Sequence, residues 1–451
     1  MPLSRILTTV AAVVVLAACA STPAPRRAAV PAAGPPLQTT QPIPKSGVGP
    51  AAIPRNQQLI PRAGAQGPAV VPGGLMRAAL LVPLSGQSAA LGQALVNAAQ
   101  MALFEVADEH LVLQIYDTQG TPDETARVTA RAISEGAQII LGPVFAADAR
   151  AAGPVAAASG VNIVTFSTDP SIAGDNVFVL GFLVPEQVRE IIAYARSQGR
   201  ERFAVLAPES AYGQAVVDAF NRYVPASGGK IAKVGIYNAA AKNIDQVIKQ
   251  MADYDARKRT LAAQKAQLAG KTDEISQAAL KRLEASDAAG EVDFDAILLP
   301  DQGTDLSRTA ALLPFYEINP GPVQFLGTLL WNQQNLGREQ ALIGGVYPAP
   351  SPDGNRQFVQ RYRELYNAVP PTLASHAYDA VALAGALARS GLARPFSAEA
   401  LTSPSGFAGV DGIFRFTQNG LSERGFAIMQ VTREGSSVAQ PPPASFGGAQ
   451  Y

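Results

Sequence analysis

The chain has 451 residues, a formal net charge of zero and a single cysteine, Cys19. A balanced charge argues against a nucleic-acid partner, which would require a basic stripe, and one cysteine excludes a disulfide within the chain. Chains of this length bury a large core and usually divide into two domains or lobes.

The first nineteen residues have the pattern of a bacterial lipoprotein signal. Arg5 precedes an apolar run over residues 6–16, and Leu16-Ala17-Ala18-Cys19 then reads as a lipobox. The run is too short to span a bilayer and ends in small residues, which favours a cleaved export signal. We expect Cys19 to carry lipid as the first residue after cleavage. The alternative is a plain secretory signal with an incidental cysteine.

The residues after the lipobox indicate where the protein is held. Ala20 and Ser21 stand where an aspartate would resemble an inner-membrane retention signal, so we expect an outer-membrane anchor facing the periplasm. Residues 20–74 carry recurring prolines among Ala, Gly and Gln, which predicts a disordered tether. Its extended reach is on the order of 150 Å at about 3 Å per residue. Residues 434–451 have a similar composition and are expected to form a second disordered tail.

Between these tails, apolar strands alternate with amphipathic helices. The predicted strands are 78–82, 111–116, 138–141, 162–166, 203–206, 231–237, 296–299 and 324–328, and the predicted helices include 91–106, 186–197, 211–223 and 245–254. A capping box at Thr121-Pro122-Asp123-Glu124 opens a further helix. Apolar strands that alternate with helices are typical of parallel sheets covered on both faces. Two such units predict an α/β protein with two doubly wound lobes.

Small molecules bind to such sheets outside the carboxyl ends of the strands. The loops at those ends contain glycines, hydroxyls and one aromatic residue, namely Ser85, Gly86, Gly142, Ser167, Thr168 and Tyr212. Glycine lets a ligand approach the backbone closely, while hydroxyls and helix-start amides can bind a carboxylate. The alternative is that the hydroxyl residues only cap helices and the glycines only turn the chain.

These loops carry a resemblance to a known family. The motifs are Val82-Pro83-Leu84-Ser85-Gly86, Leu91-Gly92, Tyr116-Asp117, Ile140-Leu141-Gly142-Pro143, Ser167-Thr168-Asp169-Pro170, Ala211-Tyr212-Gly213 and Ala377-Tyr378-Asp379-Ala380. Their order and spacing resemble type I periplasmic binding proteins of the Leu/Ile/Val-binding type over nearly all of residues 75–433. The resemblance implies two Rossmann-like lobes, joined by three crossings near Leu183, Tyr347 and Asp411, with a hinge and a ligand cleft.

The resemblance also implies domain boundaries. Lobe 1 would comprise residues 75–183 and 348–410, and lobe 2 would comprise residues 184–347 with closing strands in residues 411–433.

The resemblance further implies ligand contacts at Ser85, Ser167, Thr168 and Tyr212. At two positions the chain differs from the amino-acid binders of this family, and both differences bear on which ligand it can bind. Phe145-Ala146 stands where amino-acid binders usually place a small hydroxyl residue, and Trp331 stands near the place of an acidic group. An unpaired buried ammonium would cost several kcal/mol, so Asp301 is the possible substitute for that acid. The predicted cleft residues are Ser85, Gly86, Gly142, Ser167, Thr168, Tyr212, Asp301, Trp331 and Tyr378.

An insertion at residues 252–292 separates a helix from its following strand. Leu261, Leu268 and Ile275 recur every seven residues, and Gly270 would break the run into a helical hairpin. The hairpin is either a solvated surface feature or an interaction arm. With the lipobox, the insertion makes the chain resemble the lipoproteins known as penicillin-binding protein activators. That resemblance implies a partner, a peptidoglycan synthase, although the helical-repeat domain of well-known members is replaced here by the tether.

The sequence offers little for catalysis. His110 and His376 are the only histidines, and the chain has no Gly-x-Ser-x-Gly elbow, no His-x-x-x-His pair and no Walker loop. We therefore expect no enzyme activity, no metal and no cofactor. The favoured hypothesis is a regulator of a peptidoglycan synthase, since an outer-membrane anchor would keep the protein from diffusing to a permease. The alternative is a receptor for a small amino-acid-like or other periplasmic solute.

Overall fold

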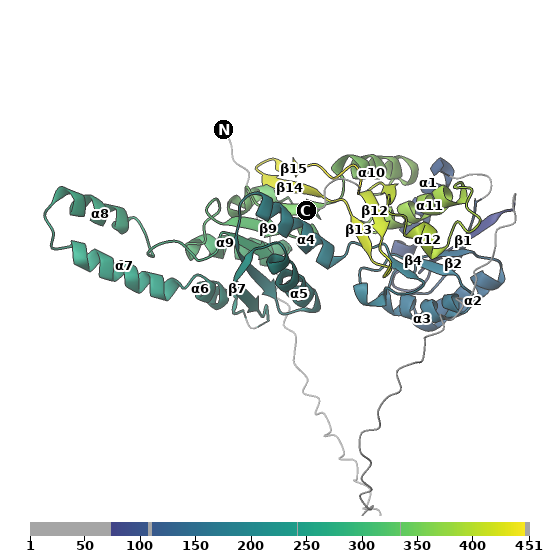
Figure 1. The fold of residues 1–451 in the computed structure, drawn as a ribbon, viewed down its shortest axis with the longest axis horizontal. Coiled ribbons are helices and arrows are strands. Elements are labelled where there is room, and N and C mark those ends of the chain that lie inside the picture. The colour runs from purple at the N-terminus through teal and green to yellow at the C-terminus, as the bar shows by residue number, and fades with distance from the viewer. Residues whose placement is uncertain (1–73, 107–110, 241, 334, 447–451) are drawn as a thin grey trace, which may run out of the picture. The chain divides into compact units, whose positions relative to one another are not determined.

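The computed structural model describes residues 74–106, 111–240, 242–333 and 335–446 (Figure 1). The predicted lipobox with Cys19, the tether up to residue 73, His110 and residues 447–451 lie outside the described residues. Within the described ranges, none of the helices combines the length and the hydropathy that a membrane span requires.

Lobe 1 is built on a parallel sheet of five strands in the order β2-β1-β3-β4-β5. Residues 78–82 of the interior strand β1 have no exposed surface, because helices cover both faces of the sheet. One face packs against α1, α10, α11 and α12, and the other packs against α2 and α3. The strands are β1 (Met76–Val82), β2 (Leu111–Asp117), β3 (Ile139–Leu141), β4 (Asn162–Thr165) and β5 (Val177–Val179), and the helices are α1 (Ala89–Val106), α2 (Pro122–Ser134), α3 (Ala146–Ala157), η1 (Pro170–Ile172), α10 (Pro352–Tyr366), α11 (Ala374–Ala388) and α12 (Ala398–Leu401).

Lobe 2 repeats this strand order in β7-β6-β8-β9-β10 and extends it with two antiparallel strands, β14 and β15. Helices α4 and α5 cover one face, and α6 and α9 cover the other. The strands are β6 (Arg202–Pro208), β7 (Lys230–Tyr237), β8 (Ala296–Leu299), β9 (Gln324–Gly327), β10 (Val346–Ala349), β14 (Ala427–Thr432) and β15 (Gly435–Gln440), and the helices are α4 (Val184–Ser197), α5 (Ala211–Ala226), α6 (Ile244–Met251), α9 (Gly303–Phe315), η2 (Leu329–Gln333), η3 (Leu336–Arg338) and η4 (Gln340–Leu342). The predicted fold class, α/β with two doubly wound lobes, is confirmed. The predicted disordered tail of residues 434–451 is wrong for residues 435–440, because their backbone pairs with β14 and extends the sheet.

A small antiparallel sheet of β11 (Phe407–Gly409), β12 (Gly412–Phe416) and β13 (Ser422–Arg424) packs on lobe 1. Phe416 meets Phe178 of β5 edge to face, with ring centroids 5.4 Å apart, and Phe414 joins the same core. The chain passes between the lobes at residues 180–183, 350–351 and 425–426. The sequence led us to expect the last crossing near Asp411. The structure places it after Arg424, since β12 buries its aromatic side chains against lobe 1.

The insertion forms a hairpin of two helices, α7 (Tyr254–Leu268) and α8 (Glu274–Glu284), which lie side by side in Figure 1. The Asp273 carboxylate caps α8 by accepting a hydrogen bond from the Ser276 amide at 2.9 Å. Leu261 is buried, but Ile275 is 83% exposed, because the chain reverses direction between the two helices. The seven-residue spacing therefore does not continue as one apolar stripe.

Candidate functional site

In lobe 1, the loop after β1 is fixed by a carboxylate at the end of the neighbouring strand. Asp117 Oδ1 accepts hydrogen bonds from the amides of Leu84 (2.8 Å), Ser85 (3.3 Å) and Gln119 (2.8 Å). Burial raises the pKa of Asp117, but these bonds and one with the Ser85 side chain outweigh it, so the pKa is lowered overall. The carboxylate thus holds the loop in place while Ser85 and Gly86 stay exposed.

The loops after β3 and β4 reach the same edge of the sheet as the loop after β1. Gly142 has φ +87°, and a Cβ there would lie 2.3 Å from the Leu81 carbonyl oxygen, so this turn requires glycine. Ser167 is buried, and its hydroxyl accepts a hydrogen bond from the Asp169 amide at 3.1 Å. Thr168 is exposed. Among the predicted hydroxyl residues of lobe 1, Ser85 and Thr168 therefore offer their side chains to solvent, while Ser167 is engaged within its own loop.

In lobe 2, two tyrosines and two further polar residues gather at the carboxyl ends of four neighbouring strands. The Tyr212 hydroxyl donates to Thr328 Oγ1 at 2.8 Å, and the Tyr237 hydroxyl donates to Asp301 Oδ1 at 2.8 Å. Burial raises the pKa of Tyr212 to about 12, so this tyrosine is a neutral donor. We call Tyr212, Thr328, Tyr237 and Asp301 the lobe 2 polar cluster.

Asp301 is the member of this cluster with unmet hydrogen-bonding capacity. The side chain is 4% exposed, and Oδ2 has no hydrogen-bond partner among the described residues. Burial raises the pKa of Asp301 to about 6, although the bond from Tyr237 acts in the opposite direction. A buried carboxylate oxygen without a donor is unfavourable, so a donor from outside the chain would stabilise this atom once the side chains that cover it give access.

Trp331 packs inside lobe 2. It has no exposed surface, and its indole Nε1 donates to the Leu299 carbonyl at 3.1 Å. The ring lies so close to Gly327 that a Cβ there would be 2.1 Å from Cδ2. In this structure Trp331 therefore contributes core packing under the strand ends rather than a surface that a ligand can reach.

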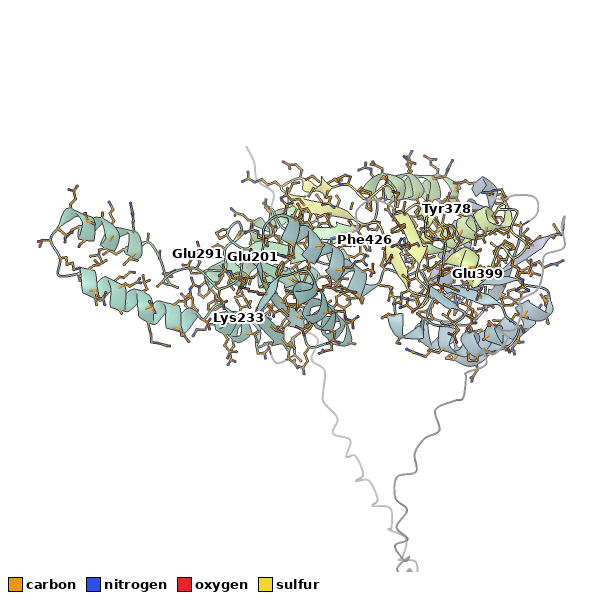
Figure 2. The ribbon with its side chains drawn as sticks, in the orientation of Figure 1. Glu201, Lys233, Glu291, Tyr378, Glu399 and Phe426 are labelled. Carbon is orange, nitrogen blue, oxygen red and sulfur yellow. The ribbon has the colours of Figure 1, made fainter. Side chains whose placement is uncertain are left out.

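Tyr378, labelled in Figure 2, lies in lobe 1 but away from the loop that carries Ser85 and Gly86. Its hydroxyl donates to Glu105 Oε2 at 2.6 Å, and its ring meets Phe358 edge to face. Glu105 is near the end of α1, and its distance along the helix axis from Ala89 is about 24 Å at 1.5 Å per residue. Since α1 starts near the carboxyl end of β1, Tyr378 is not brought together with Ser85 and Gly86.

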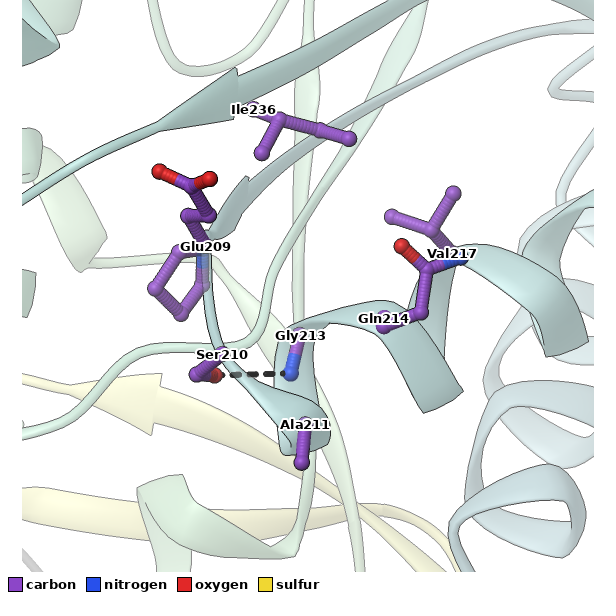
Figure 3. A pocket seen from close by; sticks show the side chains of 8 residues that line it. Glu209, Ser210, Ala211, Gly213, Gln214, Val217 and Ile236 are labelled. Atoms are coloured by element: carbon purple, nitrogen blue, oxygen red, sulfur yellow. Dashed lines mark hydrogen bonds between the residues drawn. The ribbon is translucent and has the colours of Figure 1, made fainter. Parts of the chain in front are cut away.

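A separate pocket of about 480 Å³ lies between α5 and the edge strand β7 (Figure 3). The Ser210 hydroxyl caps α5 by accepting from the Gly213 amide at 3.0 Å, while Val217 and Ile236 give the pocket apolar walls. Tyr212 does not line this pocket, so it is distinct from the lobe 2 polar cluster.

The sequence did not point to a group of buried charges near the connections between the lobes. It consists of Asp379, Asp411 and Arg424, and neutral His376 lies beside them against Phe182. Burial, with a contribution from Arg424, keeps the pKa of His376 well below its ordinary value. Over the described ranges, no group of three His, Cys, Asp or Glu side chains is arranged to hold a metal ion.

This chain is similar to a family model, to solved structures and to curated proteins. A family model described as periplasmic binding protein matches residues 76–436. A proposed branched-chain amino acid ABC transporter protein from Rhodospirillum rubrum has a similar structure, with a TM-score of 0.63 and 19% identity over 81% of this chain and 99% of that one. An ABC transporter substrate-binding protein from Desulfitobacterium hafniense in complex with Leu has a similar structure as well. Its TM-score is 0.54, with 18% sequence identity over 80% of this chain and 99% of that one.

Among curated proteins, the Leu/Ile/Val-binding protein BraC3 of Rhizobium johnstonii is 28% identical over 160 residues, which is 33% of this chain and 44% of that protein. The chain spans less than half the length of the curated relatives it matches. At these identities the solved structures show the fold alone. The family model covers most of the chain, and its residues coincide with the two lobes. The chain belongs to the periplasmic binding protein family.

Proposed function

We propose that this protein is a non-enzymatic periplasmic receptor that binds a small solute through the lobe 2 polar cluster. The observation that carries the proposal is the buried Asp301 Oδ2, which has no donor among the residues that the structure describes and lies at the strand ends where sheets of this kind bind small molecules. An ammonium or hydroxyl group of a solute would supply that donor. The related substrate-binding protein with bound Leu supports a solute of amino-acid size.

Lobe 1 would contact the other end of the solute. Ser85 and Thr168 present exposed hydroxyls. Phe145, on the loop after β3, is a half-buried aromatic residue. Since Phe145 has no side-chain donor, a carboxylate at this end would depend on hydroxyls and backbone amides. We therefore expect a solute with one donor group and a partly apolar body.

A thermal-shift screen with amino acids and muropeptides tests this function. A ligand at a hundred times its dissociation constant should stabilise the fold by about 2.7 kcal/mol. The Asp301→Asn variant should lose the shift, because the amide removes the negative charge at nearly the same volume.

The matched control is Asp305→Asn, a nearby exposed carboxylate on α9, which should keep the shift. An unchanged shift in Asp301→Asn would show that this carboxylate does not contact the solute. No shift with any compound in the screen would count against the receptor function.

The second candidate function is the regulation of a peptidoglycan synthase, for which the α7–α8 hairpin would be the contact arm. Most side chains of the hairpin are exposed, including Ile275, and four exposed basic residues have no acidic partner within the part of the chain that the structure describes: Lys258, Arg259, Lys281 and Arg282. A pair of helices with so much free surface is suited to a protein partner.

The hairpin can be removed cleanly because its ends meet. The Ala289 amide donates to the Arg257 carbonyl at 3.1 Å, so residues 258–287 can be replaced by two glycines. We expect this deletion to reduce the capture of peptidoglycan synthases in a pull-down while leaving the melting temperature within a few degrees. Equal capture by the deletion variant and the intact chain would remove the arm from consideration.

The family supports a periplasmic location, and we propose in addition that Cys19 anchors the protein to the outer membrane. Replacing Cys19 with serine should move the protein from the outer-membrane fraction to the soluble periplasmic fraction, because lipidation requires the thiol. If the unchanged protein and the Cys19→Ser variant are both found in the outer-membrane fraction, the proposed lipid anchor at Cys19 is contradicted.

A further inference from the structure

Arg424 joins two of the segments that connect the lobes. It is the last residue of β13, directly before the connection at residues 425–426, and it is only 3% exposed. Its Nη2 donates to the Leu180 carbonyl at 2.8 Å, and its guanidinium lies over the Phe182 ring, 4.7 Å from the centroid. Both of these belong to the first connection, at residues 180–183. Phe426 of the third connection, labelled in Figure 2, packs near Phe182 as well.

Two buried carboxyl groups face this guanidinium. Asp379 of α11 accepts from the Val410 amide at 2.8 Å through Oδ1, and its Oδ2 lies 3.9 Å from Arg424 Nη1. Asp411 accepts from Asn355 Nδ2 at 2.9 Å, and its carbonyl accepts from the amide of Ser351 in the second connection. All three connections between the lobes are therefore in contact with this group. We call Asp379, Asp411 and Arg424 the hinge cluster.

The charges of the hinge cluster do not balance. Two carboxylates and one guanidinium would leave one net negative charge with almost no exposed surface. His376 of α11 is neutral, and Tyr378 on the same helix bonds to Glu105. From α10 and the connection at 180–183, the described groups that meet the cluster are Asn355, a carbonyl and an aromatic ring, none of which is charged. A buried unpaired charge is strongly unfavourable.

The hydrogen bonds are incomplete in the same place. Oδ2 of Asp379, Oδ2 of Asp411 and both Nε and Nη1 of Arg424 have no hydrogen-bond partner among the described residues. A proton on one carboxyl group would convert an acceptor into a donor and would remove the excess charge at once.

We propose that the hinge cluster is a proton-binding site, in which Asp379 and Asp411 share one proton at neutral pH. The site is separate from the lobe 2 polar cluster and does not depend on solute binding. Burial and the negative charge of Asp411 raise the pKa of Asp379 to about 7, in agreement with this arrangement. Arg424 bonds to the first connection, where the three connecting segments meet. Binding or loss of the proton therefore sets the negative charge of Asp379 and Asp411 that faces the Arg424 guanidinium.

Infrared spectroscopy at about pH 6 tests the proposal directly. We expect the intact protein to show the carbonyl absorption of a protonated carboxylic acid, and this absorption should decrease in Asp379→Asn or in Asp411→Asn. The control is Asp169→Asn, because hydrogen bonds from Ser171 and Arg150 outweigh burial and lower the pKa of that carboxyl group. Its removal should leave the absorption unchanged. The same absorption in the intact protein and in both hinge variants would overturn the proposal.

A second measurement, with the hinge cluster intact, covers the case in which a hinge variant fails to fold. Glu186→Gln and Asp301→Asn are introduced first, because burial raises the pKa values of these two carboxyl groups as well. In that protein, the urea concentration at half-unfolding should fall as the pH rises from about 5 to about 8, because the folded protein binds more protons than the unfolded chain over this range. It should be the same in sodium chloride and choline chloride at equal ionic strength. A flat pH profile, or a dependence on sodium in place of pH, would show that the site does not bind a proton.

Discussion

At the scale of single residues, the same type of side chain has different roles according to its place at the strand ends. Asp117 is ionised by its amide donors and holds a loop, whereas Asp301 is buried and one of its oxygens has no hydrogen-bond partner in the described part of the chain. The sequence singled out Asp301, which comes just after an apolar strand, as a possible partner for an ammonium group, and this assignment stays a prediction. It did not separate Trp331 from the surface residues, because the turn after β9 directs the indole inward, and one-dimensional spacing does not reveal this direction.

The packing of Trp331 leads to a stability prediction. Trp331→Ala should lower the free energy of unfolding by about 3–5 kcal/mol, because a fully buried aromatic ring and its bond to Leu299 are lost. Urea unfolding measures this change. Lys258→Ala is the surface control and should stay within about 0.5 kcal/mol of the parent protein. A change below about 1 kcal/mol for Trp331→Ala would contradict the core placement.

The hinge cluster makes a pH prediction with a definite sign. The pKa of Asp379 is raised to about 7 in the folded protein, against about 3.9 for an unperturbed aspartate. Between these values the folded chain binds more protons, so stability falls as the pH rises, by at most about 1.4 kcal/mol per pH unit. Glu186 and Asp301 have raised pKa values too, so the slope must be compared between the parent and Asp379→Asn. Equal slopes would contradict the assignment to Asp379.

At the scale of elements, apolar runs and helix starts were sufficient to predict most of the parallel strands in the sheets of the two lobes. They worked because a strand covered on both faces is apolar throughout, as in β1 and β8. The strands β11, β12 and β13 did not give this signal, since they form a small antiparallel sheet with partly exposed faces. The position of the last crossing consequently differed from the expectation.

The hinge cluster was beyond prediction for a related reason. Its members come from α11, from the turn before β12 and from the end of β13, at positions 379, 411 and 424. No spacing rule connects such positions, and only the folded chain brings them together. The α7–α8 hairpin, in contrast, is a local structure, and its composition with Gly270 between the helices was enough to predict it.

At the scale of the whole molecule, the family and the fold describe a chain in which two similar lobes present loops at the carboxyl ends of their sheets. Lobe 1 contributes exposed hydroxyls, and lobe 2 contributes the polar cluster around Asp301. The proposed receptor function depends on both sets of loops acting on one solute. The hairpin and the proposed anchor at Cys19 would add a partner and a location without changing that site.

Hydrogen–deuterium exchange with a compound selected by the thermal-shift screen measures this joint action most directly. We predict that the compound slows exchange in residues 83–86 and 167–169 of lobe 1 and in residues 299–302 of lobe 2, and that Asp301→Asn abolishes the slowing in both lobes. Slower exchange confined to the α7–α8 hairpin, or no change in either set of loops, would contradict the proposed binding site.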